Sequence, residues 1–142
     1  MRILKSLTSV SGFSALMLIC ALATCLCMSA TMPKEKGEMK FDKTVHDFGH
    51  VKEDGGPVSV EFPFINAGEG NLLIYEAKAE CGCTTPDYPK APIAPGMSGK
   101  IKVTYNPLGR PGAFDKVVTV KTNGKPGKLR LKIRGTVTPK SR

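Results

Sequence analysis

Two cysteines separated by one glycine, Cys81-Gly82-Cys83, are the residues of this 142-residue chain that carry the clearest chemistry. A disulfide requires Cα atoms about 4.4–6.8 Å apart, whereas two residues of extended chain span about 7 Å. Pairing these sulfur atoms therefore requires a bend, which Gly82 can supply because it lacks a Cβ atom. A ring this small removes little entropy from the unfolded chain, so stapling the fold is a weak reason for the pair.

Three interpretations of the cysteine pair are open. The first is a local disulfide, or two small side chains at the end of a strand. The second is a soft-metal site, because two thiolates suit Cu(I) or Zn(II) and either His46 or His50 would complete it. Both histidines share one face if their segment is extended, since their spacing is even. The third is thiol–disulfide exchange with Cys81 or Cys83 as the nucleophile, which usually needs a helix N-terminus or a close cation.

No arrangement of residues typical of an enzyme accompanies the cysteine pair. Ser59 and Ser98 lie in ordinary strand and turn contexts, without the pattern of a nucleophile elbow. The glycines of Gly68-Glu69-Gly70 precede a predicted strand rather than a helix, so they do not form a phosphate-binding loop. We therefore expect a protein that is not an enzyme and that holds no cofactor.

Apolar and polar residues alternate with period two along most of the chain beyond residue 38, which indicates β-strands. Val58, Val60, Phe62 and Phe64 share one face of a predicted strand. Further alternating or continuous apolar runs occupy residues 72–75, 100–105, 117–121 and 128–134.

Turn residues separate these runs. Pro95-Gly96 fits the two central positions of a type II turn, where glycine accepts a positive φ. Residues 122–127, with Asn123-Gly124, predict a hairpin between the last two strands. No segment has a sustained helical period. The sequence thus predicts an all-β fold, a single Ig-like antiparallel β-sandwich over residues 39–138.

The first thirty residues have the pattern of a secretory signal peptide. Arg2 and Lys5 give a positive start, and an apolar run follows over residues 13–28. This run is shorter than the ~20 residues of a membrane-spanning helix. A run extended to residues 10–32 would span, so an uncleaved anchor is the alternative. Residues 31–38 are polar and predict a tether to the domain.

The end of this signal segment allows two kinds of processing. Leu22-Ala23-Thr24-Cys25 resembles a lipoprotein signal, in which Cys25 would carry the lipid, although Thr24 departs from the small residue usually found there. The alternative is cleavage of the signal peptide after Ala30 without lipid attachment. Met28, two positions before Ala30, is an unfavourable residue for that cleavage. The chain is thus expected to be exported to the periplasm or cell surface, with a lipid anchor to the membrane as one alternative.

Charge is divided unevenly along the chain. Residues 31–89 hold 6 basic and 11 acidic side chains, whereas residues 90–142 hold 13 basic side chains and a single acidic one, Asp115. If the late strands are neighbours, their polar faces form one cationic surface that attracts anionic partners, the alternative being a solvated outer face. The candidate binding residues are Lys100, Lys102, Lys128, Arg130, Lys132 and Arg134.

Short motifs spread over residues 40–138 share the pattern of one family. They are Phe48-Gly49 after His46-Asp47, Phe64-Ile65-Asn66-Ala67-Gly68, Leu73-Ile74, Cys81-Gly82-Cys83-Thr84-Thr85-Pro86, Ile93-Ala94-Pro95-Gly96, Tyr105-Asn106-Pro107 with Gly109, Gly112-Ala113-Phe114-Asp115-Lys116, and Gly135-Thr136-Val137. Together they resemble a bacterial exported family classed as domain of unknown function 1573. The resemblance implies an Ig-like sandwich akin to Hydin-type domains, and it implies no activity, because the family name records none.

The sequence predicts an exported, non-catalytic binding or structural module of the bacterial cell envelope. Its expected partner is an envelope protein, a glycan or an anionic lipid surface. Nucleic acid is not expected as a partner, because an exported protein meets little of it. Aromatic side chains that could stack on bases are also few, since only Tyr105 and Phe114 occur after residue 89. The alternative function is thiol redox chemistry or Cu/Zn handling by Cys81 and Cys83.

Overall fold

The computed structural model describes residues 35–141. The predicted signal segment, with Cys25 and residues 31–34 of the predicted tether, lies outside these residues. Within them, no helix is long and apolar enough to cross a membrane. The strands are β1 (Met39–Phe41), β2 (Val45–Lys52), β3 (Val58–Asn66), β4 (Ile74–Ala79), β5 (Thr84–Asp87), β6 (Ser98–Tyr105), β7 (Gly112–Thr122) and β8 (Lys128–Thr138).

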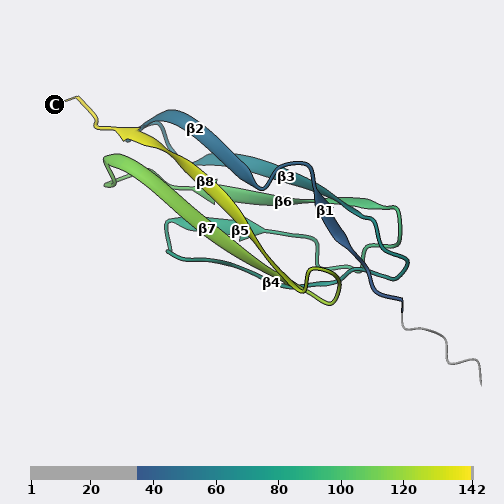
Figure 1. The fold of residues 1–142 in the computed structure, drawn as a ribbon. Coiled ribbons are helices and arrows are strands. Elements are labelled where there is room, and N and C mark those ends of the chain that lie inside the picture. Colours follow the sequence, from purple (N-terminus) through teal and green to yellow (C-terminus); the bar gives the residue numbers. More distant parts are fainter. Residues whose placement is uncertain (1–34, 142) are drawn as a thin grey trace, which may run out of the picture. The chain divides into compact units, whose positions relative to one another are not determined.

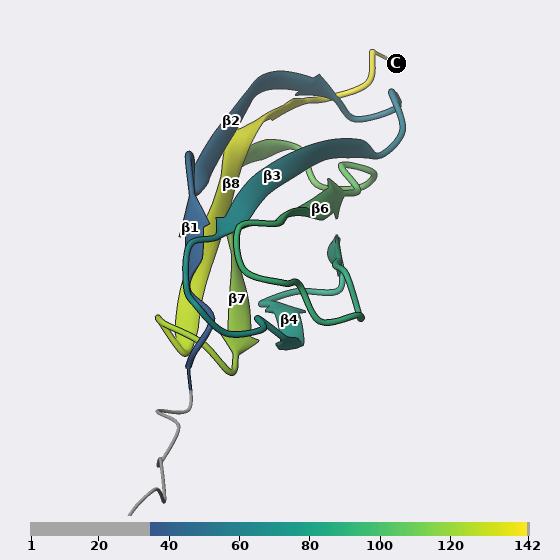
Figure 2. The same cartoon turned by 90° about the vertical axis from the view of Figure 1, so that its right-hand side faces the viewer.

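These strands form two sheets packed face to face (Figures 1 and 2). One sheet has the order β1-β3-β6-β5 and the other the order β2-β8-β7-β4. Neighbouring strands are antiparallel with one exception, the parallel pair of β2 and β8. The chain crosses from the first sheet to the second between β1 and β2. Each of these two strands is therefore an edge strand, β1 of the first sheet and β2 of the second. The predicted Ig-like sandwich is confirmed, and the parallel pair is its departure from a purely antiparallel arrangement.

The core lies between the two sheets and is built by the alternation seen in the sequence. Phe62 and Phe64 of β3 are buried, as are Leu131 and Ile133 of β8, while the residues between them face outward. Burying side chains of this size removes them from water, which supplies roughly 1.5–3 kcal/mol each. The remaining buried apolar side chains are Met39, Val51, Leu72, Ile74, Cys83, Ile93, Ile101, Val103, Tyr105, Phe114, Val118, Val120 and Val137.

Two turns hold the strands in the predicted places. Gly96 has φ +76°, and the Met97 N–H donates to the Ala94 carbonyl at 3.0 Å. This is the geometry that glycine permits at the third position of a type II turn, so the prediction at Pro95-Gly96 is confirmed. The hairpin between β7 and β8 is also confirmed, since these strands pair from Gly112↔Val137 to Lys121↔Lys128.

The domain begins earlier than the sequence predicts. Gly37 is buried and its carbonyl accepts the Lys125 N–H at 2.9 Å. The Glu38 N–H donates to Asn66 Oδ1 at 3.0 Å, and the Glu38 carbonyl accepts the Ala67 N–H at 2.8 Å. Residues 37 and 38 were expected to be part of a tether because they are glycine and glutamate, but it is their backbone groups that join the domain.

Candidate functional site

The segment Cys81-Gly82-Cys83 carries the chain from one sheet to the other. It follows β4, an edge strand of one sheet, and precedes β5, an edge strand of the other. The two cysteines form a disulfide with their Cα atoms 5.3 Å apart. That separation lies within the range that a disulfide needs. The chain therefore bends between the two cysteines as the sequence requires. Of the three interpretations of the pair, the local disulfide is the one that this structure contains.

Gly82 does not supply this bend through a left-handed backbone. The glycines with positive φ among the described residues are others, and Gly82 is not one of them. A Cβ atom added at Gly82 would meet no atom within 4 Å. The Thr84 N–H closes the turn by donating to the Cys81 carbonyl at 3.3 Å, in a conformation open to other residues. Gly82 itself is exposed, with open space where a side chain would begin.

The two cysteines differ in exposure. Cys83 is buried with 6% of its surface exposed, whereas Cys81 is half-buried. The Cys83 carbonyl accepts the Asn106 N–H at 2.9 Å, which fixes Cys83 against the end of β6. Cys81 is therefore the more exposed residue of the pair.

A third side chain, Thr84, belongs to this site and was missed as a functional residue in the sequence. Thr84 is 4% exposed, and its Oγ1 lies 3.6 Å from Cys81 Sγ and 3.7 Å from Cys83 Sγ. Disulfide sulfurs carry no hydrogen, so the hydroxyl is the donor, and its single hydrogen is shared between the two contacts. The sequence could have indicated this contact, because a residue with a hydroxyl group directly follows the second cysteine.

The two histidines do not share a face of β2, contrary to the prediction. Asp47 pairs with Arg134 and His50 pairs with Thr136, so β2 has one more residue between these positions than β8. This β-bulge includes Gly49, whose φ is +64°. One additional residue reverses the alternation beyond it. His46 is half-buried, whereas His50 is exposed.

The predicted metal site of His46, Cys81 and Cys83 is not assembled. His46 lies on β2 and the cysteines follow β4, and these strands are the opposite edges of one sheet. Its ring packs edge-on against Phe48, with ring centroids 4.5 Å apart. Among residues 35–141 no group of three or more histidine, cysteine, aspartate or glutamate side chains is placed to hold a metal ion.

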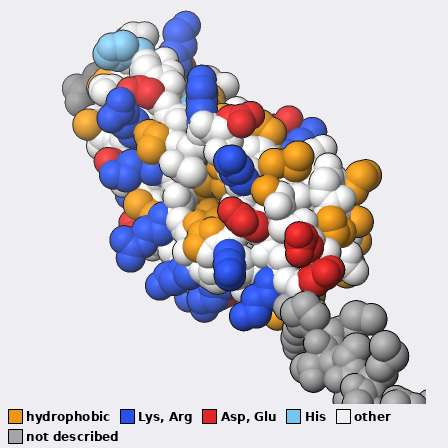
Figure 3. Space-filling view, turned by 45° about the vertical axis from the view of Figure 1, so that its right-hand side comes forward, with side chains coloured by type: hydrophobic (Ala, Val, Ile, Leu, Met, Phe, Trp, Pro, Cys, Tyr) orange, Lys and Arg blue, Asp and Glu red, His pale blue; other side chains and the backbone are white. Residues whose placement is uncertain are grey.

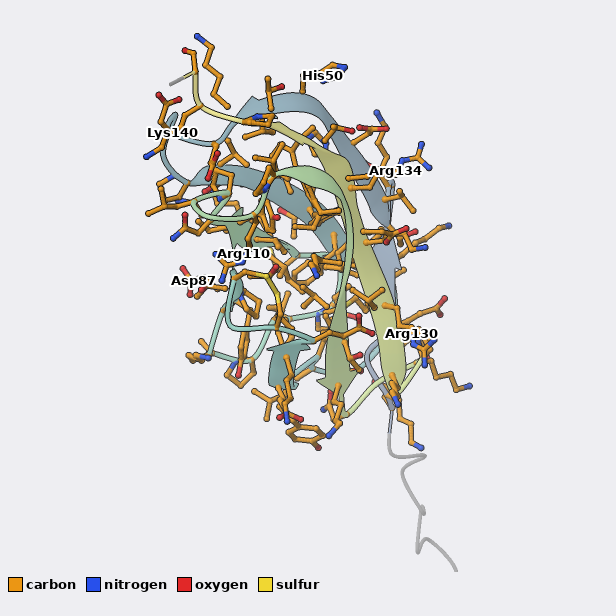
Figure 4. All side chains as sticks on the ribbon, turned by 90° about the vertical axis from the view of Figure 1, so that its left-hand side faces the viewer. His50, Asp87, Arg110, Arg130, Arg134 and Lys140 are labelled. Carbon is orange, nitrogen blue, oxygen red and sulfur yellow. A yellow bond between two sulfur atoms is a disulfide. The ribbon has the colours of Figure 1, made fainter. Side chains whose placement is uncertain are left out.

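The outer face of the β2-β8-β7-β4 sheet is predominantly basic. Along β8 the buried residues Leu131 and Ile133 alternate with exposed or half-buried basic ones. Figure 4 shows Arg130 and Arg134 projecting from β8 on one side of the molecule, with Asp87 and Arg110 on the other. By cross-strand register, the basic residues of this face are Lys52, Lys78, Lys121, Lys128, Arg130, Lys132 and Arg134, and the acidic ones are Asp47, Glu76 and Asp115. We call this surface the β8 face.

The acidic residues neutralise only part of the β8 face. Three of its basic side chains form ion pairs, namely Lys132–Asp115 at 3.4 Å, Arg134–Asp47 at 3.0 Å and Lys121–Glu76 at 2.7 Å. Over the described part of the chain, Lys128 and Arg130 form none. The space-filling view shows Lys and Arg side chains gathered along one side of the molecule (Figure 3).

Lys128 lies directly opposite Lys121 in the β7–β8 pair. Like charges at opposite positions of an antiparallel pair are destabilising. The Lys121–Glu76 ion pair relieves this repulsion in part. Excess positive charge therefore remains at this end of the β8 face.

Lys100 and Lys102 do not extend this surface. Both lie on β6, which belongs to the other sheet, so the prediction of one cationic surface containing all six residues is wrong. Lys100 forms an ion pair with Glu61 at 2.7 Å, and Lys102 is paired in register with Glu61 and Asp87. Sheet membership depends on long-range pairing that the spacing of residues along the chain does not reveal.

Two carboxylates of the β8 face are held in their charged form. The Gly49 N–H donates to Asp47 Oδ1 at 2.8 Å and Arg134 donates to Oδ2, and together they lower the pKa of Asp47 below its ordinary value of 3.8. The hydrogen bond and charge of Lys121 lower the pKa of Glu76 below 4.5. Both acids thus remain ionised at neutral pH, and their ion pairs persist.

Comparison with protein families supports the sequence resemblance. A family model described as "Protein of unknown function (DUF1573)" matches residues 39–137. A search of curated proteins finds no match to the chain.

Several solved structures share the fold. A protein of unknown function from Porphyromonas gingivalis W83 superposes with a TM-score of 0.64 at 18% identity, covering 78% of this chain and 51% of that one. The ASH/PapD-like domain 7 of human CEP192 gives 0.60 at 13% identity, covering 82% and 95%. The secreted serine protease VesC from Vibrio cholerae gives 0.53 at 13% identity, covering 70% and 23%. The chain thus spans about half the length of the Porphyromonas protein and under a quarter of VesC, and the likeness concerns the fold alone.

Proposed function

This chain belongs to the DUF1573 family of proteins of unknown function, and we propose that it is an exported, non-catalytic module that binds anionic lipid headgroups through the β8 face. The observation that carries the proposal is the excess of basic over acidic side chains on that face. Arg130 and Lys128 carry it in particular, because neither forms an ion pair within the described residues.

The shape and chemistry of the β8 face favour a lipid surface over a glycan. The outward residues of β7 and β8 include no aromatic side chain, and the exposed Tyr75 lies at the edge strand β4, away from β8. Stacking surfaces for flat rings are built from aromatic residues. A sheet instead presents its cations side by side, as a plane of headgroup phosphates requires. Each Lys or Arg near an anionic membrane contributes about 1 kcal/mol. A signal segment at residues 1–30 would bring the domain to such a membrane.

The serine nearest to a catalytic candidate on β3 is occupied by another side chain. The exposed hydroxyl of Ser59 bonds to Thr104 Oγ1 at 2.8 Å, across the pair of β3 and β6. This hydroxyl is engaged in sheet pairing rather than presented to a substrate beside a general base.

Vesicle binding tests the proposal with a matched control. The pair Lys128→Gln and Arg130→Gln removes two charges from the β8 face, and the pair Lys100→Gln and Lys102→Gln removes two from the other sheet. Sedimentation with vesicles of phosphatidylglycerol and phosphatidylcholine should show binding that weakens with salt. The first pair should weaken it by tenfold or more, since two charges contribute about 2 kcal/mol, and the second should leave it within about twofold.

Other outcomes would overturn the proposal. An equal loss in the two double variants would show that binding follows net charge and not the β8 face. Failure of the wild-type chain to sediment with these vesicles at low salt would exclude the lipid surface. Binding to a soluble sulfated glycan such as heparin, without binding to vesicles, would assign the face to a glycan instead.

A further inference from the structure

We propose that the Cys81–Cys83 disulfide is a site of thiol–disulfide exchange, in which a partner thiol attacks Cys81 and the Thr84 hydroxyl stabilises Cys83 as the leaving thiolate. This activity is separate from the lipid binding assigned to the β8 face. It rests on three features of the corner between β4 and β5.

The first feature is the unequal exposure of the two cysteines. Cys81 is half-buried and Cys83 is 6% exposed. Between them Gly82 is exposed, and a Cβ atom there would meet nothing within 4 Å. Among residues 35–141, neither backbone conformation nor packing requires glycine at this position. The missing side chain instead leaves room for another protein's thiol to approach Cys81.

The second feature is the Thr84 hydroxyl. Thr84 is almost fully buried, and in the described part of the chain its Oγ1 has two hydrogen-bond partners, the sulfur atoms of Cys81 and Cys83. A disulfide sulfur is a weak acceptor, whereas a thiolate is a charged and much stronger one. The hydroxyl is thus better satisfied after the disulfide opens than before. A hydrogen bond to the charged form of an acid lowers its pKa, and a thiol of lower pKa leaves faster.

The third feature is that the disulfide can open without opening the fold. It closes a loop of three residues. The strands on either side are held by other partners, since β4 pairs with β7 up to Ala79↔Val118 and β5 pairs with β6 from Thr84↔Tyr105. Reduction therefore releases a local corner while both sheets keep their strand order.

A partner protein that carries two thiols supplies both electrons for the exchange. A partner thiolate attacks Cys81 Sγ, the Cys81–Cys83 bond breaks, and its electron pair leaves on Cys83 Sγ. The partner's second thiolate then attacks its own sulfur in the mixed disulfide and releases Cys81. Two electrons pass from the partner to Cys81 and Cys83, the partner becomes a disulfide, and the thiolates take up the protons that the partner's thiols gave.

Limited reaction of the full-length chain with reduced glutathione tests which sulfur is attacked. The reaction is quenched with iodoacetamide and the adducts are located by mass spectrometry of peptides. Glutathione should appear on Cys81, with the alkyl group on Cys83. Adducts mainly on Cys83, or a disulfide that survives a large excess of glutathione in the folded protein, would overturn the proposal.

Variants at Thr84 separate a chemical role from a packing role. Thr84→Val keeps the shape and removes the hydroxyl, whereas Thr84→Ser keeps the hydroxyl. In the reduced protein, the pH dependence of alkylation should show a higher thiol pKa of Cys83 in Thr84→Val and a near-wild-type value in Thr84→Ser. Exchange should be about tenfold slower in Thr84→Val. Equal pKa values and rates in the two variants, with thermal unfolding unchanged, would remove the role of the hydroxyl.

A variant at Gly82 tests access. Gly82→Val should slow exchange with a reduced two-cysteine peptide severalfold more than exchange with the small reagent dithiothreitol, because the added side chain obstructs only a bulky partner. A uniform effect on both reagents, or no effect on either, would show that the open space at Gly82 does not serve a protein thiol.

Discussion

The Asn66 side-chain amide donates to the Ile93 carbonyl at 2.8 Å and thereby ties the end of β3 to the segment that leads into β6. Asn66 has no exposed surface. The same amide also donates to the Gly70 carbonyl at 2.8 Å, and Oδ1 accepts the N–H groups of Glu38 and Gly68. One buried side chain therefore bonds to backbone groups of four residues, which lie in three separate segments at one end of the sandwich.

Replacing Asn66 should destabilise the domain severely. Asn66→Ala removes the side-chain partner of two N–H groups and of the Gly70 carbonyl, while the Ile93 carbonyl keeps its bond from the Leu72 N–H. The loss should lower the free energy of unfolding by about 3 kcal/mol or more. Urea denaturation followed by circular dichroism measures this change. A loss below about 1 kcal/mol would mean that water replaces the amide and that Asn66 does not organise this end.

Asn66→Asp should produce a loss of stability that depends on pH. An ionised aspartate would face the Gly70 and Ile93 carbonyls without a hydrogen to donate, so its pKa in the folded state is raised above the unfolded value. Relative to wild type, the loss is smallest below about pH 4, where the group is protonated in both states, and grows as the pH rises through the folded pKa. Denaturation midpoints of both proteins from pH 3.5 to 7 check this sign.

Two glycine substitutions should give opposite results. A Cβ atom at Gly68 would lie 2.5 Å from the Glu38 nitrogen and the Lys36 oxygen, so Gly68→Ala forces backbone apart and should cost about 2 kcal/mol. Gly82→Ala meets nothing and should change stability by no more than about 0.5 kcal/mol. Thermal unfolding of both variants side by side makes the comparison, and a large loss in Gly82→Ala would show an unrecognised conformational need for glycine in the corner.

The pKa of Asp47 should remain lowered when its ion pair is removed. The largest cause of the shift is the hydrogen bond from the Gly49 N–H, followed among the lowering contributions by Arg134. In Arg134→Gln the pKa of Asp47, measured by NMR titration, should therefore rise only part of the way to 3.8. Because the folded pKa is lowered, the stabilisation is complete above the unfolded pKa and is lost as pH falls through the folded one. A full return to 3.8 would assign the shift to Arg134 alone.

Removing the disulfide should affect stability little. The chain-entropy estimate for a three-residue loop is about 1.6 kcal/mol, compared with about 3 kcal/mol for fifteen residues. The double variant Cys81→Ala and Cys83→Ala should therefore unfold cooperatively, with the free energy of unfolding lowered by no more than about 2 kcal/mol. A chain that fails to fold without the disulfide would make the bond structural and weaken its assignment to exchange.

The strands that the sequence predicts are those with clean period-two alternation. β3, β6, β7 and β8 each bury every second side chain over much of their length. β2 was missed because the bulge at Gly49 breaks its alternation. β5 was missed because Thr84-Thr85-Pro86-Asp87 holds no apolar alternation and includes a proline, which suits an edge strand.

The candidate sites were predictable to different degrees for the same physical reason. The disulfide joins residues two apart, so local spacing was enough to expect it. The basic residues of β8 lie on one strand, and their shared face follows from alternation alone. Whether Lys100 joins them depends on which sheet β6 enters, and the separation of His46 from Cys81 depends on the order of strands across a sheet. Both are consequences of pairing between distant segments.

The parallel pairing of β2 with β8 gives the domain a direction of mechanical strength. The first described residues and the C-terminus lie at opposite ends of the sandwich (Figure 1), and β2 pairs with β8 from Val45↔Lys132 to Lys52↔Thr138. Tension between the two ends would slide these strands lengthwise past each other and load their inter-strand bonds together. An antiparallel hairpin pulled from its open end would instead unzip one bond at a time. A domain pulled in this way would act as a shear clamp.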